Sequence, residues 1–214
     1  MQQLRPRLVP APYPEGTVCS VYFDTPSFLL VRLSLEHPVY KEKFRLRWYG
    51  EEPSDENVFP EIKKKFRGIV YKRRIACTAE EARQLLSFNT LPERKQDASL
   101  EEMRYLFCRY PLSPAVLVAY EREAWRCLSD PDIRITFDRN IRARSSELQR
   151  AGSDGAPLLP DGEVLMEIKF PGASPLWLAR LLSGLEIFPV SFSKYGTWYT
   201  DQCKRKKEKT CSPV

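Results

Sequence analysis

Pairs of basic residues separated by one position recur in several strand-like segments of this chain. The first pairs are Arg45 with Arg47, Lys63 with Lys65, and Lys72 with Arg74. Residues i and i+2 of a strand share one face of a sheet, so each pair places two cations on one face. Removing one ion from water costs several kcal/mol, and two like charges about 4 Å apart repel by roughly 4 kcal/mol. We therefore expect a hydrated, cation-lined face whose natural ligand is a polyanion.

Later segments add carboxylates to the basic residues. These charged positions are Arg122, Arg134 with Asp138, and Glu167 with Lys169. The single histidine, His37, precedes a proline in a segment expected to be a loop, which argues against a Ser-His-Asp triad. The six cysteines are scattered without a CxxC motif, so zinc is disfavoured and the thiols are expected to be reduced. Any metal should be held by carboxylates, which favours Mg²⁺ or Mn²⁺.

Composition is consistent with a folded domain that has an acidic partner. The 214 residues are 43% hydrophobic, which is enough for a core, and the net charge is +6 with a pI near 9.0. The first 16 residues lack the apolar segment of a signal peptide, and no run of about 18 apolar residues exists to span a membrane. We expect a cytoplasmic protein without a transmembrane segment of its own.

Local patterns predict mostly strands, with a few helices between them. Thr78 is expected to cap a helix over 78–87, Ser99 a second helix that ends at Pro111, and Gly68 should form a hairpin turn. The segment 28–36 reads equally as a helix or a strand. Strands are expected at residues 17–24, 42–50, 57–66, 67–77, 115–125, 132–144 and 163–170. The helix capped by Ser99 should cover 100–110, and a third helix is expected at 174–185.

Alternation within these strands predicts the fold class. Cations fall on one face and apolar residues on the other, so the sheet needs a polar interior and an apolar exterior. An α+β fold satisfies both demands if an antiparallel eight-stranded closed β-barrel has its helices packed outside. One domain should cover residues 1–200, and the basic segment 201–214 is expected to be a disordered tail.

Seven ordered motifs resemble a known family. They are VYFDT, KFRLRWYG, FPEIKKKF, VYKRR, IRITFDRNIR, LMEIKF and FSKYG, between about residues 17 and 200. This order is similar to the VTC domain of polyphosphate polymerases, in the CYTH group of triphosphate tunnel metalloenzymes. The resemblance implies an antiparallel tunnel that binds ATP, polyphosphate or other triphosphates. It also implies that a γ-phosphate passes to a growing polyphosphate chain.

The same resemblance assigns roles to individual residues. Glu167 would be the ligand of a divalent metal, Mn²⁺ or Mg²⁺, with Glu61 as a supporting acid. Lys169, Arg142 and Arg144 would be secondary contributors. The phosphate-binding set would be Arg45, Arg47, Lys63, Lys72, Arg74, Arg122, Arg134, Ser193 and Lys194.

One departure from the family pattern bears on activity. Family members begin with a strand of alternating Glu and Lys residues and then a helix, whereas residues 1–16 here read as the end of that helix. The first strand is therefore expected to be missing, which leaves a gap in the tunnel wall.

Other readings remain open. Glu167 could instead form a structural ion pair with Lys169 or Arg134. The fold could support a triphosphate hydrolase, or a non-catalytic binding module that serves a complex at the inner face of a membrane through a membrane-protein partner. Nucleic acid is disfavoured because the basic strands lack interleaved exposed aromatic residues, and no Walker-type loop is present.

Overall fold

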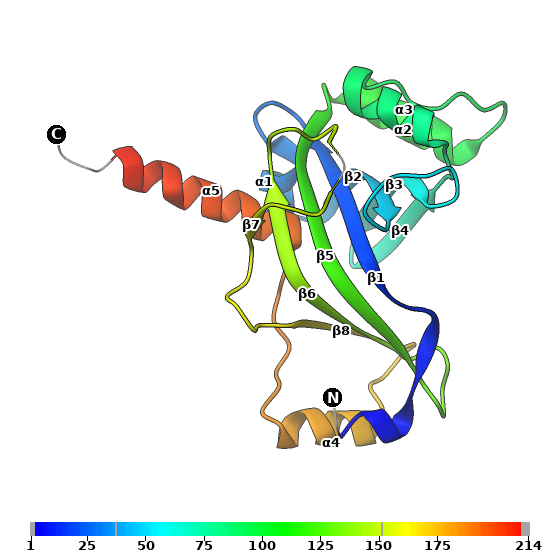
Figure 1. The fold of residues 1–214 in the computed structure, drawn as a ribbon, viewed down its shortest axis with the longest axis vertical. Coiled ribbons are helices and arrows are strands. Elements are labelled where there is room, and N and C mark those ends of the chain that lie inside the picture. Colours follow the sequence, from blue (N-terminus) through cyan, green and yellow to red (C-terminus); the bar gives the residue numbers. More distant parts are fainter. Residues whose placement is uncertain (1–2, 37, 151, 211–214) are drawn as a thin grey trace.

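The computed structural model describes residues 3–36, 38–150 and 152–210; His37 and residues 211–214 lie outside this part. An eight-stranded antiparallel sheet runs through the molecule in the order β4-β3-β2-β1-β5-β6-β7, and β8 also pairs with β6 (Figure 1). The strands are β1 Leu8–Asp24, β2 Tyr40–Tyr49, β3 Val58–Phe66, β4 Ile69–Arg74, β5 Ser113–Cys127, β6 Arg134–Arg144, β7 Ala156–Pro157 and β8 Leu165–Lys169. The helices are η1 Arg5–Arg7, α1 Leu29–Leu35, α2 Ala79–Phe88, α3 Ala98–Arg109, α4 Leu176–Gly184 and α5 Lys194–Thr210.

The predicted α+β fold with an antiparallel eight-stranded sheet is confirmed. Among the described residues no strand pairing joins β4 to β8, so the ladder does not close. The sheet nevertheless curls around one face. This brings Lys63 on β3 close enough to β8 for the charges of Glu167 and Lys169 to act on its ammonium group. We call this face the inner face, and it carries Arg45 and Arg47.

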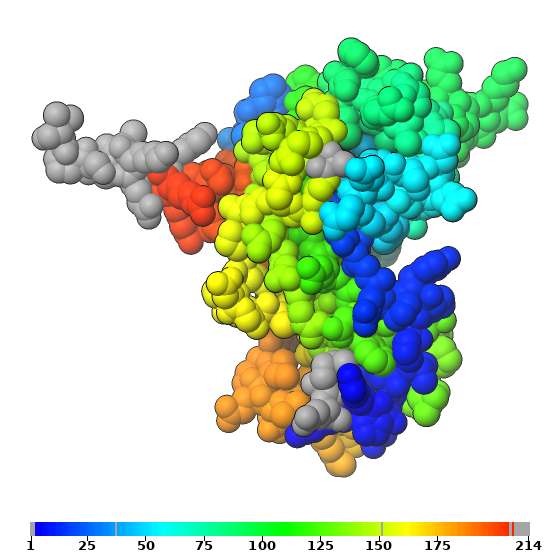
Figure 2. All heavy atoms as spheres, in the orientation of Figure 1, coloured from blue at the N-terminus to red at the C-terminus, as the bar shows by residue number. Residues whose placement is uncertain are grey.

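The outer face is apolar and covered by helices, as predicted. Under α2 and α3, the strands contribute Phe44 and Trp48, and the helices contribute Leu85 and Met103, all fully buried. At the opposite end of the sheet, α4 packs Leu178 against β5, β6 and β8. Figure 2 shows α4 at the same end of the molecule as the N-terminal residues, far from α2 and α3.

One end of the inner face is not polar, which differs from the predicted polar interior. The first turns of α5 place Tyr195 and Trp198 on Val116 and Val118 of β5. The buried carboxylate of Asp24 holds this arrangement, because it accepts hydrogen bonds from the Tyr195 hydroxyl and from backbone amides of α1. This packing fixes the position of the α5 N-terminus over the inner face.

Several local predictions can be compared with the structure. Thr78 caps α2 as expected and also forms a capping box with Glu81, but the cap of α3 is Asp97 and not Ser99. Arg67 and Gly68 both have positive φ, as a two-residue hairpin turn of type I′ requires. The segment 28–36 contains helix α1.

Two predictions about the chain ends were wrong. Residues 8–16, expected to end a helix, extend β1, because Leu8–Pro10 pair with the end of β5 despite several prolines. Residues 201–210, expected to be disordered, continue α5. The first turns of α5 pack on β5, and such tertiary contacts stabilise a helix that the polar composition alone did not indicate. None of the helices in the described part of the chain is long and apolar enough to cross a membrane.

Candidate functional site

Strand register arranges the inner-face cations in rows. Lys43, Arg45 and Arg47 alternate along β2 and therefore share its inner face. Lys43 lies directly opposite Lys63 on β3, which lies opposite Lys72 on β4. Like charges placed directly opposite one another destabilise a sheet. The repulsion between these lysines therefore lowers the stability of the sheet, and a bound anion would remove that repulsion.

The next row contains one buried carboxylate. Glu61 is 2% exposed and accepts hydrogen bonds from Arg45, at 2.8 and 2.5 Å, and from Arg74, at 2.8 Å. Lys72 lies 3.2 Å from the same carboxylate. Burial alone would raise the pKa of Glu61, but the charges of Arg45 and Arg47 outweigh it and lower the pKa to about 2. Glu61 therefore orients Arg45 and Arg74, and its charge is neutralised by these arginines and Lys72.

Arg47 is a buried cation held by hydroxyl groups. Its guanidinium donates to the Ser20 hydroxyl at 3.1 Å and to the Tyr120 hydroxyl at 3.3 Å, and the residue is 9% exposed. Within the described part of the chain, no carboxylate lies at ion-pair distance from Arg47, and the same holds for Lys43 and Lys63. These three cations of the inner face have positive charge available for a ligand.

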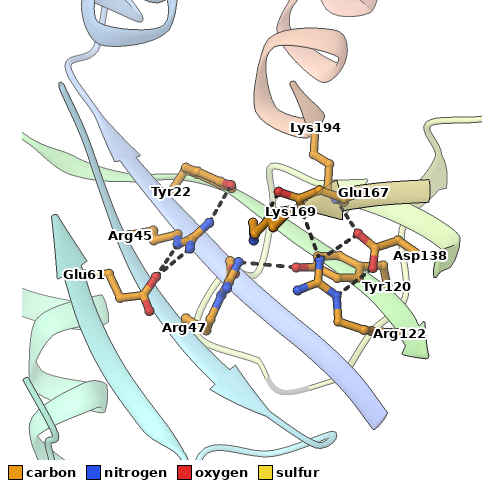
Figure 3. Close-up of polar contacts among 11 residues, drawn as sticks. Tyr22, Arg45, Arg47, Glu61, Tyr120, Arg122, Asp138, Glu167, Lys169 and Lys194 are labelled. Atoms are coloured by element: carbon orange, nitrogen blue, oxygen red, sulfur yellow. Dashed lines mark hydrogen bonds and ion pairs between the residues drawn. The ribbon is translucent and has the colours of Figure 1, made fainter. Parts of the chain in front are cut away.

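Tyr22 lies among these cations. Its hydroxyl accepts a hydrogen bond from Arg45 at 3.2 Å (Figure 3). Its ring stacks on Tyr195 of α5. Burial would raise the pKa of this phenol, but the charges of Arg45 and Arg47 lower it to about 8. The shift reports a strongly positive local potential.

A second cluster forms where β5, β6 and α5 meet. Arg122 makes a bidentate contact with the buried Asp138 at 2.7 and 2.9 Å, and Lys194 reaches the same carboxylate at 2.7 Å (Figure 3). Both cations also lie over the Tyr120 ring, at 5.1 and 4.4 Å from its centroid. Burial raises the pKa of Asp138, but the Arg122 hydrogen bonds and the Lys194 charge lower it below its usual value. This geometry indicates that Asp138 orients Arg122 and Lys194.

Glu167 is the most accessible carboxylate of the site. It is 45% exposed, lies 3.2 Å from Lys169 and 3.8 Å from Arg122, and faces the inner space from β8. Burial would raise its pKa, but the Lys169 charge and hydrogen bond lower it. A structural ion pair with Lys169 is thus present, and the remaining exposure leaves the carboxylate open to a cation.

The carboxylates of the site limit how a divalent metal could be held. The described residues contain no group of three or more His, Cys, Asp or Glu side chains able to hold a metal ion. Glu61 and Asp138 are saturated by cations, which leaves Glu167. Mg²⁺ in proteins is commonly bound by one or two carboxylates together with substrate phosphates. The donor set fits a metal that arrives with a phosphate ligand.

Ser193 connects the N-terminus of α5 to β2. Its hydroxyl accepts hydrogen bonds from the Gly196 amide and from the Lys43 ammonium, both at 3.2 Å. The partial positive charge of a helix N-terminus favours anions at this position. Ser193 and Lys194 therefore border the site from the α5 side.

Some predicted residues do not join these clusters. Arg134 is on the same face as Asp138, but it lies opposite Lys169 at the far end of β6, and no described hydrogen bond links it to the clusters. Arg142 and Arg144 were wrongly expected near the site. They pair with outer-face positions of β5 and bind the loop after β6, Arg142 at Gly155 and Arg144 at Asp154.

The sequence interpretation missed Lys43, Tyr22, Tyr120 and Ser20. Lys43 could have been found, because it precedes Arg45 by two positions on the same strand. The other three carry no charge, and only the register of β1 and β5 with β2 brings them beside the arginines.

Comparisons with known proteins agree with this geometry. The sequence model of the VTC domain matches residues 2–200. A vacuolar transporter chaperone complex subunit 4 from Trypanosoma brucei brucei is 26% identical over 224 residues, which cover 86% of this chain. The chain spans only 28% of the length of that relative.

Two solved structures share the fold. A candidate adenylate cyclase from Bacillus halodurans superposes with a TM-score of 0.53 at 16% identity, over 90% of this chain and 84% of its own. A candidate adenylyl cyclase from Hippeastrum, described as having a dominant triphosphatase activity, gives a TM-score of 0.52 at 13% identity, over 94% of this chain and 87% of its own.

Proposed function

The chain belongs to the VTC domain family, and from this premise we propose that its inner face binds the triphosphate of ATP and transfers the γ-phosphate to a growing polyphosphate chain. The observation that carries the proposal is the group Lys43, Arg47 and Lys63, three cations of the inner face with no carboxylate at ion-pair distance among the described residues. A chain of phosphates supplies several closely spaced negative charges, and therefore neutralises such a row better than a single anion does.

The arginines, lysines and buried carboxylates of the site would have different roles in phosphoryl transfer. Phosphoryl transfer needs positioning and charge neutralisation more than a protein nucleophile. Arg45, Arg47 and Arg122 offer planar guanidinium groups that can contact two phosphate oxygens at once, whereas lysines act as point charges. Glu61 and Asp138 hydrogen-bond four of the basic side chains and hold them in place before the ligand arrives; these are Arg45, Arg74, Arg122 and Lys194.

In the proposed reaction, a terminal oxygen of the acceptor phosphate forms a bond to the γ-phosphorus. The bond between that phosphorus and the β–γ bridging oxygen breaks, and a nucleoside diphosphate leaves. Lys63, Lys72 and Lys194 would neutralise charge on the transferred group and on the leaving group. Glu167 would hold the metal, Mn²⁺ or Mg²⁺, which supplies Lewis-acid polarisation of the phosphates when bound.

Product analysis tests this proposal. The protein is incubated with ATP and Mn²⁺, and the products are resolved on a gel. Long phosphate chains support the polymerase, free phosphate alone would indicate a triphosphate hydrolase, and binding without turnover would indicate a binding module. Glu167→Gln should remove the metal-dependent turnover; Glu163→Gln, an exposed neighbour, is the matched control.

We further propose that the chain works on the cytoplasmic side of a membrane as part of a complex. The support is its similarity to a protein named as a complex subunit. Cross-linking in cells followed by fractionation should recover the chain with membrane proteins. Recovery of the chain alone in the soluble fraction would contradict this proposal.

A further inference from the structure

The hairpin that joins β3 to β4 ends in an apolar tip exposed to solvent. Six large apolar side chains around its turn are between 40% and 64% exposed; they are Val39, Tyr40, Phe66, Ile69, Val70 and Tyr71, and we call them the hairpin patch. Strand register makes the patch continuous, because Tyr40 lies opposite Phe66 and Phe66 lies opposite Ile69. Exposed apolar patches on folded domains commonly mark a surface that contacts a partner or a membrane.

The helices that cover the outer face do not cover the hairpin patch. Four positions before Phe66, Ile62 lies opposite Phe44, and both are fully buried under α2 and α3. Phe66 continues this outer face beyond the helices, whereas Val70 lies opposite Lys65 on the inner face. All six residues of β4 are exposed. Apolar side chains therefore surround the tip on both faces of the sheet.

The hairpin also carries positive charge. Residues 62–79 contain seven lysines and arginines and no aspartate or glutamate. In the part of the chain that the structure describes, neither Lys65 nor Arg67 has a carboxylate at ion-pair distance. The guanidinium of Arg67, at the turn itself, lies 5.3 Å from the centre of the Phe66 ring. Cations without acidic partners thus border the apolar tip directly.

Protection of a sheet edge does not explain both features. β4 is the last strand of the ladder, and charged residues on an edge strand oppose pairing with another chain. That role accounts for Lys72 and Arg73, but the exposed Ile69 and Val70 work against it. A protein partner would cover one face of the hairpin, whereas the surface of a bilayer can surround a tip on both faces.

We propose that the hairpin patch inserts into the surface of a membrane that contains anionic lipids. The apolar side chains would enter the boundary between headgroups and acyl chains, where aromatic residues such as Tyr40 and Tyr71 are favoured. Lys65 and Arg67 would contact the headgroups, because basic residues close to an anionic membrane surface strengthen binding. This contact is made by the chain itself, and it depends neither on the proposed phosphoryl transfer nor on a membrane-protein partner.

Vesicle binding tests the proposal. The protein is mixed with vesicles of phosphatidylcholine, alone or together with phosphatidylserine, and the bound fraction is measured by cosedimentation. We expect the wild type to bind the mixed vesicles at least tenfold more tightly than the neutral ones. Ile69→Ser with Tyr71→Ser should lose about tenfold in affinity for the mixed vesicles, because apolar atoms no longer enter the bilayer. Phe88→Ser with Leu128→Ser removes two exposed apolar side chains elsewhere and should bind as the wild type does.

Two single variants separate insertion from a change in folding. Arg67→Asn keeps a residue that tolerates the positive φ of this position, and it should weaken binding to the mixed vesicles about fivefold. Ile69→Trp should bind these vesicles at least as tightly as the wild type. Relative to the wild type, its added tryptophan fluorescence should shift to shorter wavelength when the vesicles are bound.

Titration of tripolyphosphate into the same proteins keeps this test separate from the proposed function. Each variant should bind tripolyphosphate as the wild type does, because none of the substituted side chains belongs to the inner-face clusters. Unchanged vesicle affinity of Ile69→Ser with Tyr71→Ser would overturn the proposal, as would an Ile69→Trp spectrum that does not shift. Wild-type protein that binds both kinds of vesicle equally, or neither, would also overturn it. Loss of vesicle and tripolyphosphate binding together in the serine variant would assign the vesicle contact to the inner face and contradict the proposal.

Discussion

Individual cations on the inner face differ in what holds them. Arg45, Arg74 and Arg122 contact buried carboxylates, whereas Arg47 contacts only hydroxyl groups among the described residues. A buried ion without a counter-ion costs stability. Arg47 is therefore expected to favour ligand binding while lowering the stability of the fold. Substitutions at this position can separate the effect on binding from the effect on stability.

Arg47→Met should separate binding from stability. Removing the buried cation should leave the free energy of unfolding unchanged or raise it by about 1 kcal/mol. Triphosphate affinity should fall at least tenfold, since a charge-assisted hydrogen bond contributes about 1.5–3 kcal/mol. Denaturant titration and calorimetry measure the two effects. Arg73→Met, which removes a cation paired with Glu102 on the outer face, is the control. A less stable variant with intact affinity would show that Arg47 is structural.

Glu61 should make the fold sensitive to acid. Its folded pKa of about 2 is below the ordinary value of 4.5, so its contribution is complete above about pH 5 and is lost as the pH falls toward 2. The shift corresponds to about 3 kcal/mol. In denaturant titrations, Glu61→Gln should be less stable than the wild type by roughly this amount at pH 7. The difference should shrink on acidification, and a constant difference from pH 7 to pH 3 would contradict the assignment.

At the scale of elements, α5 depends on Ser193 for its beginning and for its contact with β2. Ser193→Ala should cost about 1 kcal/mol of unfolding free energy, because the Gly196 amide loses its acceptor. Ser193→Asp should restore the cap and the stability, since Asp is an equally good cap. Its added negative charge beside Lys43 should weaken triphosphate binding at least tenfold. If Ser193→Asp bound triphosphate as tightly as the wild type, the α5 N-terminus would not border the site.

The strands and α5 also show which features of the fold could be predicted from the sequence. Alternation correctly placed Arg45 and Arg47 on one face and Trp48 on the other, because a strand has a fixed period of two. It could not supply register, which alone brings Tyr120 of β5 to Arg47 of β2. The first turns of α5 were also beyond local pattern, since their packing on β5 depends on contacts about 80 residues apart in the chain.

For the whole molecule, the fold is an antiparallel sheet that presents an apolar outer face to its helices and a cationic inner face to a ligand. The net charge of +6 should attract polyanions over a distance of about one Debye length, roughly 10 Å at 0.1 M salt. Affinity for tripolyphosphate should therefore fall steadily between 50 mM and 500 mM salt, measured by calorimetry. An affinity independent of salt would indicate that apolar contacts dominate binding.

The inner-face cations that have no carboxylate partner among the described residues are proposed to form a phosphate-chain site. Calorimetric titration of tripolyphosphate into the wild type and into Lys43→Ala with Lys63→Ala tests it most directly. Lys64→Ala with Lys95→Ala removes the same charge outside the site and serves as the control. We predict that the control binds as the wild type does and that the inner-face variant loses at least tenfold in affinity without loss of stability, because repulsion between facing lysines is relieved. Equal affinity in both variants, or no binding by the wild type, would contradict the claim.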